Sequence, residues 1–161
     1  MKRIPKEKVW GGTAAKYDER QLQIRSVVFT RTWVMTAVLL LACSFVEGGL
    51  EVEWALPWQT HLIVAAAATA YSGIELLLRG AYFERNGMTG WGVPYMLAAL
   101  SLISTVWHIV DFARGEKIAE NGALTVDGGF FVTTLLLLAF GVVGVVKSRQ
   151  LRKHWEKPDE E

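Results

Sequence analysis

The chain has 161 residues, of which 52% are hydrophobic, and its formal net charge at pH 7 is +1. This length suits a single domain, and the near balance of acidic and basic residues gives no net positive charge for binding nucleic acid. The single cysteine, Cys43, excludes an internal disulfide and a metal site built from several thiolates. Charged residues concentrate near the chain ends and in short connectors, and the long apolar runs between them indicate a membrane protein.

Four apolar runs are each long enough to cross a bilayer, which takes roughly 20 helical residues because the hydrocarbon is about 30 Å thick. In hydrocarbon every backbone polar group has to be paired internally, so each run is expected to be a helix. The predicted fold is therefore all-α, a polytopic four-helix transmembrane bundle within residues 18–153. Its spans are expected at about residues 30–48, 59–79, 93–113 and 128–147. Residues 1–17 and 154–161 are expected to be a flexible N-terminal segment and a C-terminal tail, both in the cytoplasm.

The distribution of basic residues predicts the orientation of these helices. Of the 17 lysine and arginine residues, all but two lie before or at the start of the first run, from the end of the second run to the third, or from the end of the fourth run onward. The exceptions, Arg114 and Lys117, follow the third run. Because cytoplasmic loops carry the excess of Lys and Arg, we expect a multi-pass protein of the inner (plasma) membrane with both termini in the cytoplasm.

The first helix is expected to begin well before the membrane. Asp18 is a suitable N-cap residue, and Gln21 stands three residues later in the capping-box position. Glu19, between them, suits the positive end of the helix dipole. The helix is therefore predicted to start near Glu19 and to enter the membrane without a break.

The same segment carries a resemblance to known proteins. Residues 16–21 read Lys-Tyr-Asp-Glu-Arg-Gln and precede the first span by about a dozen residues. This pattern resembles a largely uncharacterised group of small multi-pass membrane proteins, mainly of Gram-positive bacteria, which have an Asp-Glu-Arg-Gln signature before their first helix. The resemblance implies a bacterial plasma-membrane protein that works with a regulatory partner. It transfers no catalytic residue to this chain.

Small residues recur along the predicted helices at the spacing that allows close helix packing. They are Ala65, Thr69 and Gly73 on the second helix, Ala98, Ser101 and Thr105 on the third, and Gly141 and Gly144 on the fourth. Two interpretations remain open. The small residues either pack the helices of one subunit together or form the seam of a homodimer.

Glu75 is an ionisable residue inside the second run, where a charged side chain is costly. Arg79 follows one turn later, in the favourable order for a helical ion pair, and Arg31 of the first helix lies at a similar depth. This group is interpreted either as an intramembrane ion pair at the inner border that fixes helix register or as a step in proton or ion movement.

A second polar group is expected near the outer border. His61 lies near the outer end of the second helix, and His108 and Asp111 lie near the outer end of the third. Imidazole and carboxylate groups are common ligands of zinc and other divalent metals, and two histidines on facing helices can hold a haem. These residues are therefore a candidate metal or haem site. The other interpretation is that the histidines simply bond to water or backbone.

The expected function is inferred from the absence of catalytic motifs in the sequence. The sequence has no glycine-rich phosphate loop, no pair of cysteines and no His-Glu-x-x-His motif, so catalysis is not predicted. We expect a non-enzymatic protein that contacts the lipid bilayer and binds a membrane subunit, a second copy or a cytoplasmic regulatory protein. The alternative is a membrane subunit that handles a metal ion, a proton or a redox cofactor (haem or quinone) at the outer His/Asp cluster.

Overall fold

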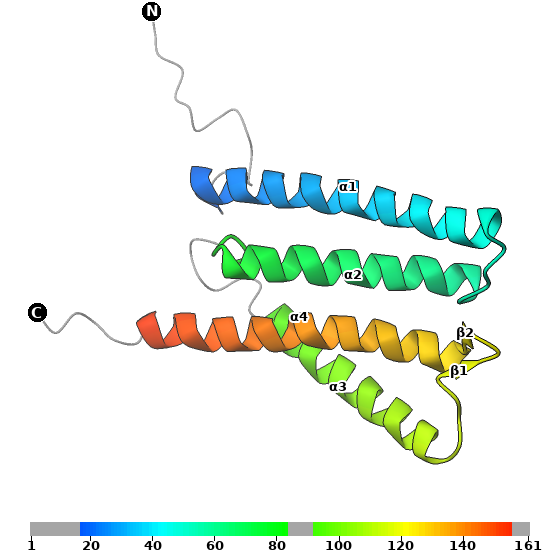
Figure 1. The fold of residues 1–161 in the computed structure, drawn as a ribbon. Helices are drawn as coiled ribbons and strands as arrows, with labels where there is room; N and C mark the ends of the chain where they lie inside the picture. The colour runs from blue at the N-terminus through cyan, green and yellow to red at the C-terminus, as the bar shows by residue number, and fades with distance from the viewer. Residues whose placement is uncertain (1–16, 84–91, 156–161) are drawn as a thin grey trace, which may run out of the picture.

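A computed structural model describes residues 17–83 and 92–155, with side chains as far as residue 151. In these ranges the chain forms four long helices and one short antiparallel hairpin (Figure 1). The elements are α1 (Glu19–Gly49), α2 (Pro57–Leu78), α3 (Gly92–Ala113), β1 (Ala119–Glu120), β2 (Ala123–Leu124) and α4 (Val126–Trp155). The expected segments 1–17 and 154–161 lie almost wholly outside the described residues.

All four helices are long and apolar enough to cross a membrane, which confirms the expected helical class and the number of candidate spans within the described chain. α1 and α4 have 31 and 30 residues, whereas α2 and α3 have 22 each. At about 1.5 Å per residue, the longer pair measures about 45 Å, the thickness of a bilayer with its headgroups. At the end of the molecule where α1 begins, α4 extends beyond α2 and α3 (Figure 1).

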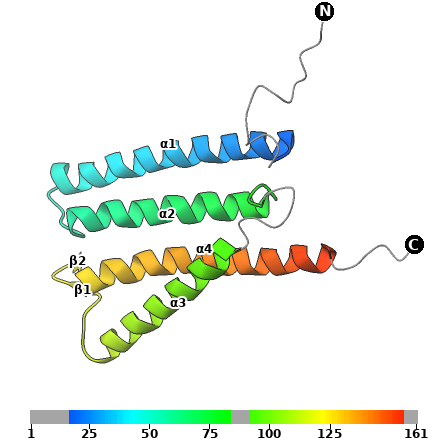
Figure 2. The ribbon, with the colours of Figure 1, turned by 180° about the vertical axis from the view of Figure 1, so that it is seen from behind.

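The helices form an open row. α1 packs on α2, α2 packs on α4, and α4 packs on α3, so the row does not follow chain order. α1, α2 and α4 lie side by side, and α3 crosses α4 and then diverges from it (Figure 2). We call the end where α1 begins and α4 finishes the terminal end, and the opposite end, which carries β1 and β2, the hairpin end.

The start of α1 is as predicted. The Asp18 carboxylate accepts a hydrogen bond from the backbone N–H of Gln21 at 2.6 Å, and the Gln21 side-chain oxygen accepts one from the backbone N–H of Asp18 at 3.2 Å. This reciprocal pair is a capping box, which satisfies two backbone N–H groups that the first turn of a helix leaves unpaired.

The interface between α3 and α4 is built on small residues. A Cβ atom added at Gly141 would lie 2.6 Å from the backbone nitrogen of Ala98, so the two backbones nearly touch. Gly144 packs in the same way against Pro94, and the Ser101 and Thr105 side chains farther along α3 are buried. The small residues predicted on these two helices therefore pack one subunit internally.

On α2 the close-packed face differs from the predicted stripe. Gly73 packs directly on the Phe140 ring of α4, as expected. Ala65 and Thr69, however, are exposed, and the buried small residues are Ala66 and Ala70. Ala70 belongs with Leu77, Phe83 and Phe140 to the main hydrophobic core cluster.

The hairpin end is tied together by one buried amide. The Gln59 side chain is 1% exposed. Its nitrogen donates to the carbonyl oxygens of Thr125 and Val126, at 3.0 and 3.2 Å, and its oxygen accepts from the backbone N–H of Leu56 at 3.0 Å. These bonds fasten the start of α2 to the start of α4. Gly129 leaves the space that the Gln59 side chain occupies.

Candidate functional site

At the terminal end, polar side chains of α1 hold the segment that follows α2. The Gln21 side-chain nitrogen donates to the carbonyl oxygens of Gly80 and Phe83, at 3.0 and 3.3 Å. One turn later, Nη1 of Arg25 donates to the carbonyl oxygen of Ala81 at 3.0 Å. Below these bonds, Val28 packs with Leu76 and Ala81 in a second small core cluster. The Asp-Glu-Arg-Gln segment thus both begins α1 and attaches it to the rest of the chain.

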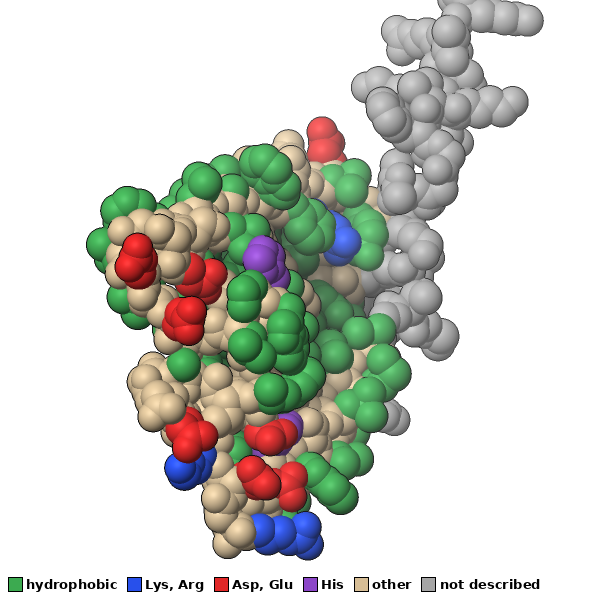
Figure 3. All heavy atoms as spheres, turned by 90° about the vertical axis from the view of Figure 1, so that its right-hand side faces the viewer, with side chains coloured by type: hydrophobic (Ala, Val, Ile, Leu, Met, Phe, Trp, Pro, Cys, Tyr) green, Lys and Arg blue, Asp and Glu red, His purple; other side chains and the backbone are tan. Residues whose placement is uncertain are grey.

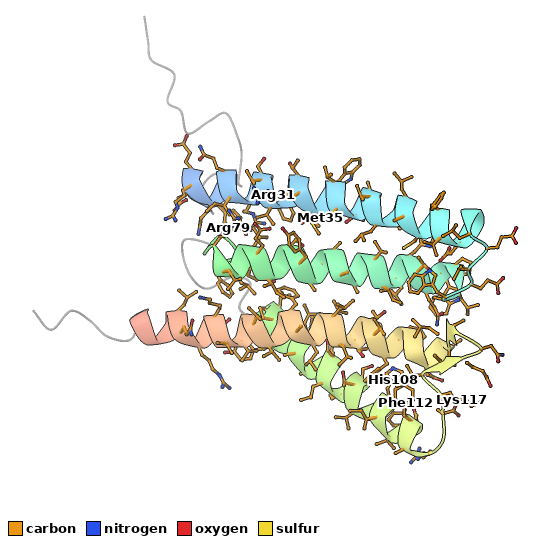
Figure 4. The ribbon with its side chains drawn as sticks, in the orientation of Figure 1. Arg31, Met35, Arg79, His108, Phe112 and Lys117 are labelled. Atoms are coloured by element: carbon orange, nitrogen blue, oxygen red, sulfur yellow. The ribbon has the colours of Figure 1, made fainter. Side chains whose placement is uncertain are left out.

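The three residues of the predicted intramembrane ion pair lie together. Oε1 of Glu75 lies 2.6 Å from Nη2 of Arg79 and 3.6 Å from Nη1 of Arg31 (Figure 4). The Glu75 side chain is 13% exposed, whereas the two arginine side chains are about half exposed. One carboxylate therefore joins α1 to α2 and leaves one positive charge uncompensated within the group. The second oxygen, Oε2, is buried and has no hydrogen-bond partner.

A cavity of about 400 Å³ opens near the same end. All four helices contribute to its walls, together with the residues that flank α1 and α2. The lining residues are Tyr17, Arg25, Phe29, Thr69, Ser72, Gly73, Leu76, Tyr82, Val93, Leu97 and Phe140. Its volume lies within the range of small-molecule binding sites, about 300–1,000 Å³.

Aromatic rings surround the Arg25 guanidinium at the terminal end of this cavity. Its central carbon lies 4.2 Å from the centre of the Tyr17 ring and 5.6 Å from that of Phe29, within the range of cation–π attraction. Burial raises the pKa of the Tyr82 hydroxyl, so this side chain is a neutral hydrogen-bonding group at physiological pH.

The contact between α1 and α2 is loose in its middle. A gap of about 140 Å³ lies between the two helices, and Met35 of α1 borders it (Figure 4). Polar contacts hold the interface on both sides of the gap, since Thr60 of α2 donates to the Glu47 carboxylate at 2.6 Å near the hairpin end. Val28 is the single buried residue of α1.

At the hairpin end, the residues of the predicted metal or haem site have separate partners. His61 is exposed, and its Nδ1 donates to the carbonyl oxygen of Pro57 at 2.6 Å. Asp111 faces Arg114, the residue that follows the end of α3, with 3.7 Å between Oδ1 and Nη1. His108 is buried beside the rings of Phe112 and Phe131, at 6.2 and 6.3 Å between ring centres, and its Nδ1 has no hydrogen-bond partner.

The order of the helices keeps His61 and His108 apart. The sequence-based expectation places α2 and α3 next to each other, but α4 lies between them in the row. In the view onto the hairpin end, the visible histidine side chains are separated by hydrophobic side chains (Figure 3). Within the part of the chain that the structure describes, no group of three or more His, Cys, Asp or Glu side chains is placed to hold a metal ion.

The contacts of Gln59 and Arg25 were not predicted from the sequence. Gln59 carries only a weak signal, because its position in the first turn of α2 suits a side chain that accepts a backbone N–H. Arg25 is one of many basic residues near the N-terminus, and its place in the cavity wall depends on helix packing.

Comparison with protein families, with curated proteins and with solved structures finds no match.

Proposed function

We propose that this chain is a non-enzymatic, multi-pass protein of a bacterial plasma membrane that binds a partner subunit through α1, with both termini in the cytoplasm. The excess of basic residues at the terminal end supports the orientation. The Asp18–Gln21 signature, through its resemblance to small bacterial membrane proteins, supports the location and a regulatory role.

The exposure of α1 carries this proposal. In the most apolar 18-residue window of α1 only 6% of the residues are buried, against 33% for α2. α1 packs on a single neighbour, and large side chains such as Leu41 and Phe45 are 72% and 65% exposed. A helix of this kind contributes little to the core of its own subunit and presents most of its surface to other molecules in the membrane.

The occupant we propose is a transmembrane helix of another membrane subunit. Ser44 and Gly48 lie four residues apart on the exposed surface of α1, and no atom lies within 4 Å of a Cβ built at Gly48. Small residues at this spacing let two helix backbones approach, and a serine hydroxyl can bond across such an interface. The acyl chain of a lipid cannot form such a hydrogen bond with the Ser44 hydroxyl, so a protein partner fits this surface better.

Site-specific photocrosslinking in membranes tests this interface. A photoreactive amino acid at Leu41 of α1 is expected to give one discrete protein product, which Gly48→Leu abolishes. The matched control is Ile103 of α3, which is 66% exposed and is expected to give lipid adducts alone. A product of twice the subunit mass, containing two differently tagged copies, would instead identify a homodimer. Identical products at both positions, or none at Leu41, would contradict the assignment.

The alternative function, a subunit that handles a metal ion, proton, haem or quinone, has one observation in its favour. Nδ1 of His108 is buried without a partner, although His61 and Asp111 bond elsewhere. An absorption spectrum and metal analysis of the purified protein separate the two functions. A haem band, or stoichiometric metal that His108→Ala removes, would favour the alternative.

A further inference from the structure

The cavity at the terminal end has a polar end and an apolar interior. Tyr17 and Tyr82 lie just outside the ends of α1 and α2, and Arg25 lies in the second turn of α1, whereas Thr69 and Phe140 lie in the middle of their helices. The hydroxyls of Thr69 and Ser72 already donate to carbonyl oxygens of α2. The deeper walls are otherwise formed by carbon, from Phe29, Gly73, Leu76, Leu97 and Phe140.

Arg25 has hydrogen-bonding capacity to spare. A guanidinium has five N–H donors, and the Ala81 carbonyl accepts from one nitrogen. Among the described residues no carboxylate pairs with Arg25, because Glu75 is engaged by Arg31 and Arg79. The contacts with the rings of Tyr17 and Phe29 hold the guanidinium in place without neutralising its charge. An anion with several oxygens would complete its bonding.

The depth of the cavity matches that of a lipid headgroup. Arg25 is about 9 Å along α1 from Arg31, at about 1.5 Å per residue, and Arg31 lies beside Glu75 within the predicted span of α2. Headgroups add about 5–7 Å on each side of the hydrocarbon, so a side chain as long as that of Arg25 reaches this layer from its position on α1. α1 and α3 both line the cavity but do not pack on each other, so neither closes the space between them.

From these observations we propose that the cavity binds one anionic phospholipid, whose phosphate pairs with Arg25 and whose acyl chain lies along Phe29, Leu97 and Phe140. A basic pocket between transmembrane helices is a recognised form of site for acidic headgroups. This binding site is separate from the proposed partner interface on the exposed surface of α1. A lipid bound in this cavity would contact all four helices and so connect α1 to α2, α3 and α4.

The test measures binding to the full chain purified in a neutral detergent, by native mass spectrometry. The probes are dioctanoyl phosphatidylglycerol, dioctanoyl phosphatidylcholine and inorganic phosphate. The wild-type protein is expected to bind phosphatidylglycerol at least about tenfold more tightly than phosphatidylcholine. Both lipids offer a phosphate to Arg25, but the choline cation of phosphatidylcholine offsets its charge and repels the guanidinium, whereas phosphatidylglycerol has a net negative headgroup. Inorganic phosphate alone is expected not to compete.

Three variants locate the site. Arg25→Gln is expected to lose about tenfold in affinity for phosphatidylglycerol. Arg20→Gln removes a charge from an exposed position one turn earlier, outside the cavity lining, and is expected to bind as the wild type does. Thr69→Phe adds bulk at an exposed cavity-lining position and is expected to weaken binding while Arg25 remains.

Several outcomes would overturn the proposal. Equal affinity for the two lipids would mean that the cavity does not select an anionic headgroup. Equal losses in Arg20→Gln and Arg25→Gln would mean diffuse attraction to basic residues, and competition by inorganic phosphate would mean a site for a soluble anion. If Arg25→Gln does not fold, Thr69→Phe decides, because unchanged lipid binding in that variant would exclude the cavity.

Discussion

The Glu75 carboxylate is shared by two arginines and is mostly buried, so its loss is expected to destabilise the protein. In Glu75→Gln both guanidinium groups lose their counter-charge. The cost should fall between that of a surface ion pair, about 0–1 kcal/mol, and that of a broken buried pair, about 3–5 kcal/mol, because the arginines are half exposed. Thermal unfolding in detergent measures this difference.

The matched control is Glu120→Gln at the hairpin end. Glu120 also pairs with a basic residue, Lys117, at 2.7 Å, but both side chains are more than half exposed. Its loss is expected to change the free energy of unfolding by less than about 1 kcal/mol. A similar decrease in the free energy of unfolding in the two variants would show that burial does not make the Glu75 ion pair more stabilising than an exposed one.

Residue contacts could be predicted from the sequence where they are local. The Asp18–Gln21 capping box was predictable because both partners lie in one helical turn. The bond from Arg25 to Ala81 joins residues 56 positions apart. This bond forms only because the segment after α2 packs beside α1, and a local sequence pattern does not show which segments pack together.

Among the elements, α3 and α4 have the closest contact, and Gly141 is the point at which it can be tested. In Gly141→Ala the new methyl group would overlap the backbone of Ala98, which cannot rotate away as a side chain can. Overpacking of this kind typically costs about 1–3 kcal/mol, more than the roughly 1 kcal/mol that alanine gains over glycine in a helix. Gly141→Ala should therefore lower the unfolding temperature.

Gly48→Ala is the control, because no atom lies within 4 Å of a Cβ at that position. It should gain the helix propensity of alanine without a clash and leave the unfolding temperature equal or higher. The two substitutions are chemically identical, so opposite signs would isolate the packing effect. A stabilising Gly141→Ala would contradict the packing of α3 on α4 described above.

The packing faces of the helices were only partly predictable. On α3 the small residues stand at helical spacing among large ones, so Ala98, Ser101 and Thr105 mark the interface clearly. α2 instead has alanines at every position from 65 to 68, so small side chains cover all sides of the helix. Their size could not indicate that Ala66, rather than Ala65, faces a neighbour.

At the scale of the whole molecule, the lateral order of the helices could not be predicted from the sequence, and this order determines which residues are neighbours. Hydropathy locates spans along the chain, and charge orients them, but neither states which helices are neighbours. The expected cluster of His61, His108 and Asp111 assumed that α2 and α3 are adjacent. Because α4 lies between them, residues at the same depth have different surroundings.

The orientation of the whole molecule is the remaining prediction. Along the sequence, all but two of the 17 basic residues fall near the start of α1, between α2 and α3, or near the finish of α4, so the terminal end should face the cytoplasm. In a Cys43→Ala background, Glu53→Cys lies in the exposed connector at the hairpin end, and Gln150→Cys lies in the exposed last turns of α4. A membrane-impermeant maleimide added to intact cells is expected to label the first variant and to label the second only after permeabilisation. Labelling of both variants from the same side would mean that an even number of spans, rather than the three helices α2, α3 and α4, separates residues 53 and 150. Reversed labelling would place the terminal end outside. Either result would contradict the charge argument, because the work of moving so many cations across the membrane is the reason for the expected orientation.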